Sequence, residues 1–200
     1  FSLSEISMTI KKGDFVGIVG ETGSGKSTLI NLFIGLLKPL KGKIEVDEKD
    51  IFSNLPKWHK KIGYVPQSIY LTDDTIRKNI AFGLREEEIE DNLVKHAIKK
   101  ANLNELVEKL PNGMDTIVGE KGIKFSGGQQ QRIGIARSLY HDPEILILDE
   151  ATSSLDLSTE KKIMQSIQSL KGKKTLIVVT HRLSTVQYCD NIFYISNGKI

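Results

Sequence analysis

Cysteine and long hydrophobic runs are both scarce in this sequence of 200 residues. Its single cysteine, Cys189, cannot form a disulfide within the chain, which fits a reducing compartment and a role as a small apolar filler. The longest apolar runs, such as Ile145 to Leu148, have the length of a buried strand. They fall far short of the roughly 18 residues that a membrane-spanning helix needs.

Neither sign of charge is in large excess. Lys and Arg total 28 and Asp and Glu total 25, and the resulting net charge of +3 is too small to indicate nucleic acid, so we expect no nucleic-acid partner. With 39% hydrophobic and 26% charged residues, the composition is typical of a globular protein. The first residue is Phe1 and no signal-peptide pattern follows it. We therefore expect a domain excised from a longer chain.

Short apolar runs predict strands at 15–19, 62–65, 145–148, 176–179 and 192–195. The runs at 145–148 and 176–179 are continuous rather than alternating, as expected for strands buried on both faces of a parallel sheet. Helical patterns follow Gly25 up to about Leu37, and also cover about 128–140 and 158–170. This alternation of strands and helices predicts an α/β fold.

The middle of the chain, from about residue 75 to residue 110, is helical and polar, and we interpret it as a helical insertion. Glutamates at 86–88 and 90 are expected to open a helix there, and lysines at 95, 99 and 100 to close it. Acidic residues first and basic residues last suit the helix dipole. The glutamates themselves are expected to form a solvated face.

A glycine-rich loop follows the first predicted strand and precedes a helix. It has the form G-x-x-x-x-G-K-S and consists of Gly20, Glu21, Thr22, Gly23, Ser24, Gly25, Lys26, Ser27 and Thr28. Glycines let the backbone approach phosphate oxygens, and successive N–H groups then point at the anion together with the helix N-terminus. In this context the loop predicts a nucleotide phosphate site, with Lys26 at the β- and γ-phosphates and Ser27 on Mg²⁺. The alternative is a plain glycine-rich turn.

Two carboxylates end the strand predicted at 145–148. Asp149 and Glu150 are adjacent, and adjacent residues on a strand point to opposite sides, so they cannot perform the same task. Asp149 is expected to face the Mg²⁺ that Ser27 holds. Glu150 is expected to reach a water in line with the γ-phosphate as general base. The alternative is an acidic strand end that leads into a turn.

Two further polar residues follow predicted strands. Gln67 has an amide that can ligate Mg²⁺ or position the attacking water, although alone it is indistinguishable from a polar loop residue. His181 follows the strand at 176–179, where its imidazole can bond to the γ-phosphate. Because ligands of open α/β sheets bind at the carboxyl ends of the strands, both residues are candidates for the same site.

A second glycine pair opens a second helix, in the run Ser126, Gly127, Gly128 and Gln129. Ser126 can cap that helix, and its first N–H groups form another anion site. One phosphate loop needs only one nucleotide. The second helix end is therefore best explained as binding the nucleotide of another copy of the domain.

Together these residues resemble the nucleotide-binding domain of ABC transporters, over essentially the whole chain. In the family's order, Gly20 to Thr28 resembles the Walker A motif, Gln67 the Q-loop, and Ser126 to Gln129 the signature; Ile145 to Glu150 resembles Walker B, Ser154 to Asp156 the D-loop, and His181 the switch histidine. Two departures are Phe125, where the family usually has leucine, and the lack of an assignable aromatic residue for stacking on adenine.

The resemblance implies a P-loop fold with a RecA-like core of mostly parallel sheet, a small antiparallel β subdomain and an inserted helical subdomain. It implies core parts at 1–67 and 142–200 and a helical part at 68–141. It further implies ATP and Mg²⁺ as cofactors and a head-to-tail dimer in which Ser126, Gly127 and Gly128 contact the γ-phosphate in trans and Asp156 crosses the interface. A homodimer is compatible with this, because both sets of motifs are complete.

Three stretches resemble the exporter branch of the family. They are Asp149 to Asp156 with alanine at 151, Thr180 to Thr185, and Asp115 to Gly122, which resembles the exporter X-loop. The segment from Tyr70 to Phe82 resembles that of lipid-linked saccharide flippases. These likenesses imply an ATPase at the cytoplasmic face of a membrane, with a transmembrane domain upstream in the same chain, that powers transport by ATP-driven dimerisation. The alternatives are a soluble ABC-type ATPase and a P-loop kinase; the kinase leaves the signature unexplained.

Overall fold

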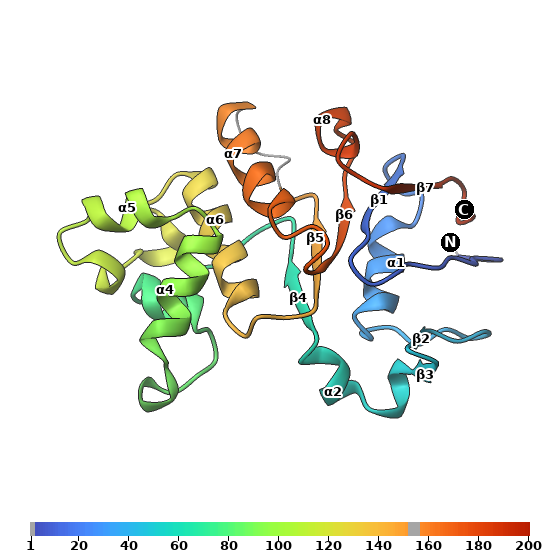
Figure 1. Ribbon diagram of the computed structural model, residues 1–200, viewed down its shortest axis with the longest axis horizontal. Coiled ribbons are helices and arrows are strands. Elements are labelled where there is room, and N and C mark those ends of the chain that lie inside the picture. The colour runs from blue at the N-terminus through green and yellow to red at the C-terminus, as the bar shows by residue number, and fades with distance from the viewer. Residues whose placement is uncertain (1–2, 152–156) are drawn as a thin grey trace. The chain divides into compact units, whose positions relative to one another are not determined.

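The computed structural model describes residues 3–151 and 157–200. Within these ranges the main sheet has the strand order β4-β5-β6-β1-β7 (Figure 1). Its strands are β1 (Phe15–Gly20), β4 (Ile62–Val65), β5 (Ile145–Asp149), β6 (Thr175–Val179) and β7 (Asn191–Ile195). The pairs β5–β6, β6–β1 and β1–β7 are parallel. A separate antiparallel pair joins β2 (Glu45–Val46) to β3 (Lys49–Asp50). The predicted fold class is thereby confirmed.

The chain folds into two compact units. The first takes Phe1–Tyr64, Glu144–Glu150 and Lys171–Ile200, and therefore contains the main sheet up to Tyr64 of β4. The second takes Val65–Pro143 and Ala151–Leu170. The finer division of the chain into 1–67, 68–141 and 142–200 stays a prediction.

The first unit is built around a cluster of buried aliphatic side chains. Its helices are α1 (Lys26–Phe33), α2 (Leu55–His59) and α8 (Leu183–Val186), with a 3₁₀ turn, η1 (Ile51–Ser53). Helix α1 contributes Ile30 to the cluster, and the strands contribute Ile18, Ile147 and Ile177. Burying each such side chain stabilises the fold by about 1.5–3 kcal/mol. This burial fixes α1, and with it the glycine-rich loop, against the sheet.

Helix α1 ends at Phe33 rather than at the predicted Leu37. Gly35 takes a left-handed φ of +76°, and a Cβ there would lie 2.6 Å from the Leu55 side chain. The indole Nε1–H of Trp58 donates to the carbonyl of Phe33 at 2.8 Å, so a helix-end carbonyl is satisfied from α2. Gly35 therefore ends the helix, and the apolar pattern alone did not predict this end.

The second unit is helical. It contains α3 (Ile76–Ile80), α4 (Asp91–Lys100), α5 (Asn104–Lys109), α6 (Gly127–Leu139) and α7 (Leu157–Gln168), with 3₁₀ turns η2 (Glu86–Glu88), η3 (Gly113–Asp115) and η4 (Glu120–Gly122). Helices α3 and α4 both pack on α6. Val94 and Ala97 of α4 are completely buried, as is Ile133 of α6. In the described ranges, no helix combines the length and the hydropathy that crossing a membrane requires.

The glutamates at 86–88 do not open a long helix, so that prediction was wrong. They form the separate turn η2, after which Ile89 is extended and α4 begins only at Asp91. Ile89 is buried, and the N–H of Glu90 donates to the hydroxyl of Tyr140 at 3.0 Å. This side-chain bond and the burial of Ile89 hold the backbone out of a helix between the two elements.

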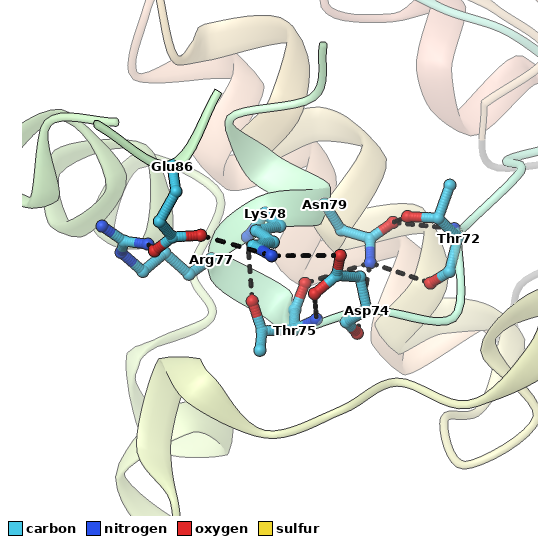
Figure 2. Close-up of polar contacts among 7 residues, drawn as sticks. All are labelled: Thr72, Asp74, Thr75, Arg77, Lys78, Asn79 and Glu86. Carbon is cyan, nitrogen blue, oxygen red and sulfur yellow. Dashed lines mark hydrogen bonds and ion pairs between the residues drawn. The ribbon is translucent and has the colours of Figure 1, made fainter. Parts of the chain in front are cut away.

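Asn79 organises the segment that contains α3. Its side chain is fully buried, and its amide group bonds to Thr72, seven residues earlier, and to the carbonyl of Thr75, four residues earlier (Figure 2). Figure 2 also shows Lys78 between the carboxylates of Asp74 and Glu86, at 3.5 and 3.3 Å. Because a buried amide is costly unless it is bonded, Asn79 specifies one conformation for this segment.

Candidate functional site

Three predicted site segments meet at one edge of the sheet of the first unit. Strand β6 lies between β5 and β1, and all three are parallel, so their carboxyl ends point the same way. Val179 pairs with Ile18 on one side and with Asp149 on the other. The glycine-rich loop after β1, the pair Asp149 and Glu150, and His181 after β6 therefore share this edge, as open α/β sheets require of a ligand site.

The glycine-rich loop is shaped by three unusual glycines. A Cβ on Gly20 would lie 2.3 Å from the carbonyl oxygen of Ile195, so only glycine fits there. Gly23 has a φ of +81° and faces open space, since a Cβ there would meet nothing within 4 Å. Gly25, with a φ of +112°, is the N-cap of α1 and supplies no capping side chain. The first N–H groups of α1 are thus left for an anion.

Two buried polar side chains point to the nature of that anion. The hydroxyl of Ser24 is buried and has no hydrogen-bond partner among the described residues. Lys26 is 8% exposed, and its Nζ donates to the carbonyls of Gly20 and Glu21, each at 2.8 Å. Phosphate oxygens could accept hydrogen bonds from both groups, the unpaired Ser24 hydroxyl and the buried Lys26 ammonium. Ser27 and Thr28 follow in the first turn of α1, where Ser27 is exposed.

Asp149 is half-buried at the end of β5. Burial raises the pKa of the Asp149 carboxyl, the hydrogen bond from Tyr64 lowers that pKa, and the charges of Glu150 and Lys26 act in opposite directions. Burial and the neighbouring carboxylate raise the pKa of Tyr64 to about 12, so the phenol keeps its proton. Lys26 of the glycine-rich loop is close enough to act on this carboxyl, and carboxylate and hydroxyl oxygens such as those of Asp149 and Ser27 are ligand types that Mg²⁺ accepts.

Glu150 adopts a backbone conformation that is rare for residues other than glycine. Its φ is +47°, and its N–H donates to the carbonyl of Val179 at 3.0 Å. The carboxylate is 21% exposed, and its Oε1 lies 3.7 Å from Nδ1 of His181, whose side chain is 60% exposed. Non-glycine residues with positive φ cluster at functional sites. The strained backbone of Glu150 is therefore compatible with the prediction that its carboxylate acts as the base.

The remaining predicted residues belong to the second unit or lie outside the described ranges. Gln67 is an exposed residue that follows β4. Ser126 caps α6: its Oγ accepts from the N–H of Gln129 at 3.3 Å, and the Gln129 side chain accepts from the N–H of Ser126 at 2.8 Å. Gly127 is exposed, and a Cβ there would meet nothing within 4 Å. Asp156 lies outside the described residues.

One contact of the site was missed from the sequence. Tyr64 donates a hydrogen bond to Oδ2 of Asp149 at 3.3 Å, across 85 residues of chain. No motif includes Tyr64, and its apolar ring suits a buried strand as well as a site. Only the neighbouring positions of β4 and β5 in the sheet reveal the contact.

A family model described as ABC transporter matches residues 3–153. This chain belongs to the ABC transporter family. It is 41% identical over 199 residues to ABC transporter ATM1 of Toxoplasma gondii, covering 99% of this chain and 17% of that protein. It is 40% identical over 201 residues to the ATP-dependent lipid A-core flippase of Ralstonia nicotianae, covering 100% of this chain and 34% of the flippase.

A solved structure of a bacterial Atm1-family ABC exporter with ATP bound superimposes with a TM-score of 0.86 at 39% sequence identity, covering 96% of this chain and 34% of that one. The chain therefore has the fold of an exporter-type ATP-binding domain of the ABC family, a family of ATPases. It spans about a third of the length of the flippase relative and of the exporter.

Proposed function

We propose that this chain is the ATPase domain of an exporter, in which binding and hydrolysis of Mg-ATP drive dimerisation and substrate translocation across a membrane. The observation that carries the proposal is the meeting of the glycine-rich loop, Asp149, Glu150 and His181 at one sheet edge of a single unit. The similarity to an exporter with ATP bound supports it.

The loop from Gly20 to Thr28 would bind the phosphates. Its backbone N–H groups and the hydroxyl of Ser24 donate to phosphate oxygens, and Lys26 exchanges its bonds to the loop carbonyls for the β- and γ-phosphates. Ser27, Asp149 and Gln67 would hold Mg²⁺. That cation supplies charge neutralisation at the transferring phosphoryl group.

Glu150 would remove a proton from the attacking water. Its carboxylate is mostly buried, and its Oε1 lies 3.7 Å from Nδ1 of His181. His181 would donate a hydrogen bond to the γ-phosphate and so keep that phosphate oriented toward the water. Gln67 would position the same water or bind the cation.

A second copy of the domain would complete the site. Gly127 is exposed at the start of α6, where free N–H groups can bind an anion, so Ser126, Gly127, Gly128 and Gln129 would contact the nucleotide of the partner. Asp156 would lie at the same interface. An isologous homodimer provides two such sites by symmetry. The relatives are transporters, and we propose a membrane domain upstream in the same chain, with this domain at the cytoplasmic face.

Light scattering on the Glu150→Gln variant tests the proposal. Without hydrolysis, Mg-ATP should convert a monomer into a stable dimer, because the nucleotide stays in the closed state. Adding Ser126→Arg to this variant should leave ATP binding intact and block the dimer. A Glu150→Gln protein that binds ATP and stays monomeric would contradict the dimeric part of the proposal. One that binds no ATP would overturn the nucleotide site itself.

A further inference from the structure

Tyr64 contacts a residue of the site, but the proposed mechanism gives Tyr64 no role. It lies on β4, the neighbour of β5 in the sheet, and both residues belong to the first unit. The phenol donates to Oδ2 of Asp149 at 3.3 Å in a partly buried setting. The bond therefore connects two strands that are far apart in the sequence, and it ends on the carboxylate that is proposed to hold the cation.

We propose that Tyr64 is a positioning residue for the Asp149 carboxylate. The phenol engages Oδ2 and leaves Oδ1 of the same carboxylate for the cation. The inference rests on the proposed function and adds to it a residue from a strand that no phosphate or signature motif includes.

Mg²⁺ makes such positioning important. It takes oxygen ligands at about 2.0–2.1 Å in a nearly ideal octahedron, so a carboxylate that rotates freely is a poor ligand. Groups that hydrogen-bond to a ligand fix its orientation, and losing one typically costs about 10–100-fold in metal affinity. Two charged groups near Asp149 serve this purpose less well: Glu150 repels the carboxylate, and Lys26 donates to the loop carbonyls.

The competing explanation is that Asp149 merely satisfies a half-buried phenol. In that case the Tyr64→Phe change would alter stability and leave the cation unaffected. The two explanations differ in one measurable quantity, the concentration of Mg²⁺ at which nucleotide binding responds to the metal.

The test titrates Mg²⁺ against binding of a fluorescent, non-hydrolysable ATP analogue to the full-length protein. For Tyr64→Phe we expect affinity in EDTA within about twofold of wild type and a half-saturating Mg²⁺ concentration raised by about tenfold. Tyr194→Phe is the matched control, because Tyr194 is an exposed tyrosine on β7, and it should match wild type. Thermal unfolding of each variant checks that the fold is kept.

A double-mutant cycle with Asp149→Asn shows whether Tyr64 acts through that carboxylate. We expect Tyr64→Phe to have no further effect on the Mg²⁺ dependence once Asp149 is replaced. An unchanged half-saturating Mg²⁺ concentration in Tyr64→Phe, or an equal and additive effect in the Asp149→Asn background, overturns the positioning role. A wild-type protein that binds no nucleotide would overturn the proposed function and this inference together, whereas normal wild-type binding isolates the inference.

Discussion

The Oε1 atom of Glu150 lies 3.7 Å from Nδ1 of His181, although the two residues follow different strands. This separation exceeds a hydrogen bond, so neither side chain is locked by the other. The two side chains come together because β5 and β6 are adjacent and parallel and end at the same level, Asp149 opposite Val179. A carboxylate and an imidazole are thus brought close together, which is the arrangement that the proposed mechanism needs.

Replacing His181 with alanine should slow ATP hydrolysis by at least about a hundredfold, because the γ-phosphate loses a positioned donor. Nucleotide affinity should change little, since the loop from Gly20 to Thr28 is untouched. Phosphate release and equilibrium binding measure the two effects separately. His96→Ala, an exposed histidine on α4, is the matched control and should behave as wild type. Normal hydrolysis by His181→Ala would remove that residue from the mechanism.

Two loop glycines should respond differently to alanine. At Gly20 a Cβ would lie 2.3 Å from the carbonyl of Ile195, so backbone must shift at a cost of roughly 1–3 kcal/mol or more. At Gly23 the space is open and the cost is the left-handed backbone alone, about 1–2 kcal/mol. Denaturant unfolding should therefore rank Gly20→Ala as the less stable variant. The reverse order would contradict the loop geometry.

Arg137 should be sensitive even to lysine. From α6 its guanidinium donates to the carbonyls of Asn79 and Tyr70 at 2.7 and 2.8 Å and to Oδ1 of Asn79 at 3.1 Å, and it stacks on Phe82 at 4.6 Å. Lysine keeps the charge but cannot reproduce the planar, multiply bonded guanidinium. Arg137→Lys should therefore lower the free energy of unfolding by about 2–4 kcal/mol.

The control for this change is Arg85→Lys, because Arg85 is an exposed side chain paired with Glu88 at 3.0 Å. That change should alter the free energy of unfolding by less than about 0.5 kcal/mol. Equal effects at the two arginines would show that the bonds to Asn79 contribute little. Urea unfolding of both variants provides the comparison.

Asp190 should make stability depend on acid pH. The ion pair with Lys171 and the N–H of Phe15 lower the pKa of this carboxyl. Because the folded-state pKa lies below the unfolded one, the stabilisation is complete above the unfolded value and is lost as the pH falls through the folded value. Asp190→Asn should therefore lower the melting temperature at pH 7, and the gap to wild type should narrow below about pH 4. If the difference in melting temperature between wild type and Asp190→Asn stays constant with pH, the effect of the substitution comes from packing rather than from the charge of Asp190.

The strands of the main sheet were predicted to within one residue at each end, whereas the short strands β2 and β3 were not located by residue. The prediction was clearest for β5 and β6, because strands buried on both faces leave continuous apolar runs. The run at 176–179 became Thr175–Val179, and the run at 145–148 became Ile145–Asp149. The meeting of the loop, Asp149 and His181 was also foreseeable, since parallel strands bring their carboxyl ends to one edge.

Three features could not be predicted, because each depends on tertiary contacts. Helix α1 stops at Phe33 because Gly35 packs against Leu55, which lies in another helix. The turn η2 is separated from α4 by the burial of Ile89 and the bond from Glu90 to Tyr140. The contact of Tyr64 with Asp149 depends on which strands are neighbours, and hydrophobic pattern alone does not specify strand order.

The place of β1 between β6 and β7 has a consequence for how the domain is made. The ribosome synthesises β1 well before its two partners, which begin only at Thr175 and Asn191. At about 5–20 residues per second, the apolar strand and its attached loop wait roughly 10–30 s before the first pairing edge exists. During that interval the proposed nucleotide site is incomplete, because Asp149 and His181 are not yet beside the loop. The nascent strand is therefore exposed to mispairing until synthesis and long-range pairing are complete.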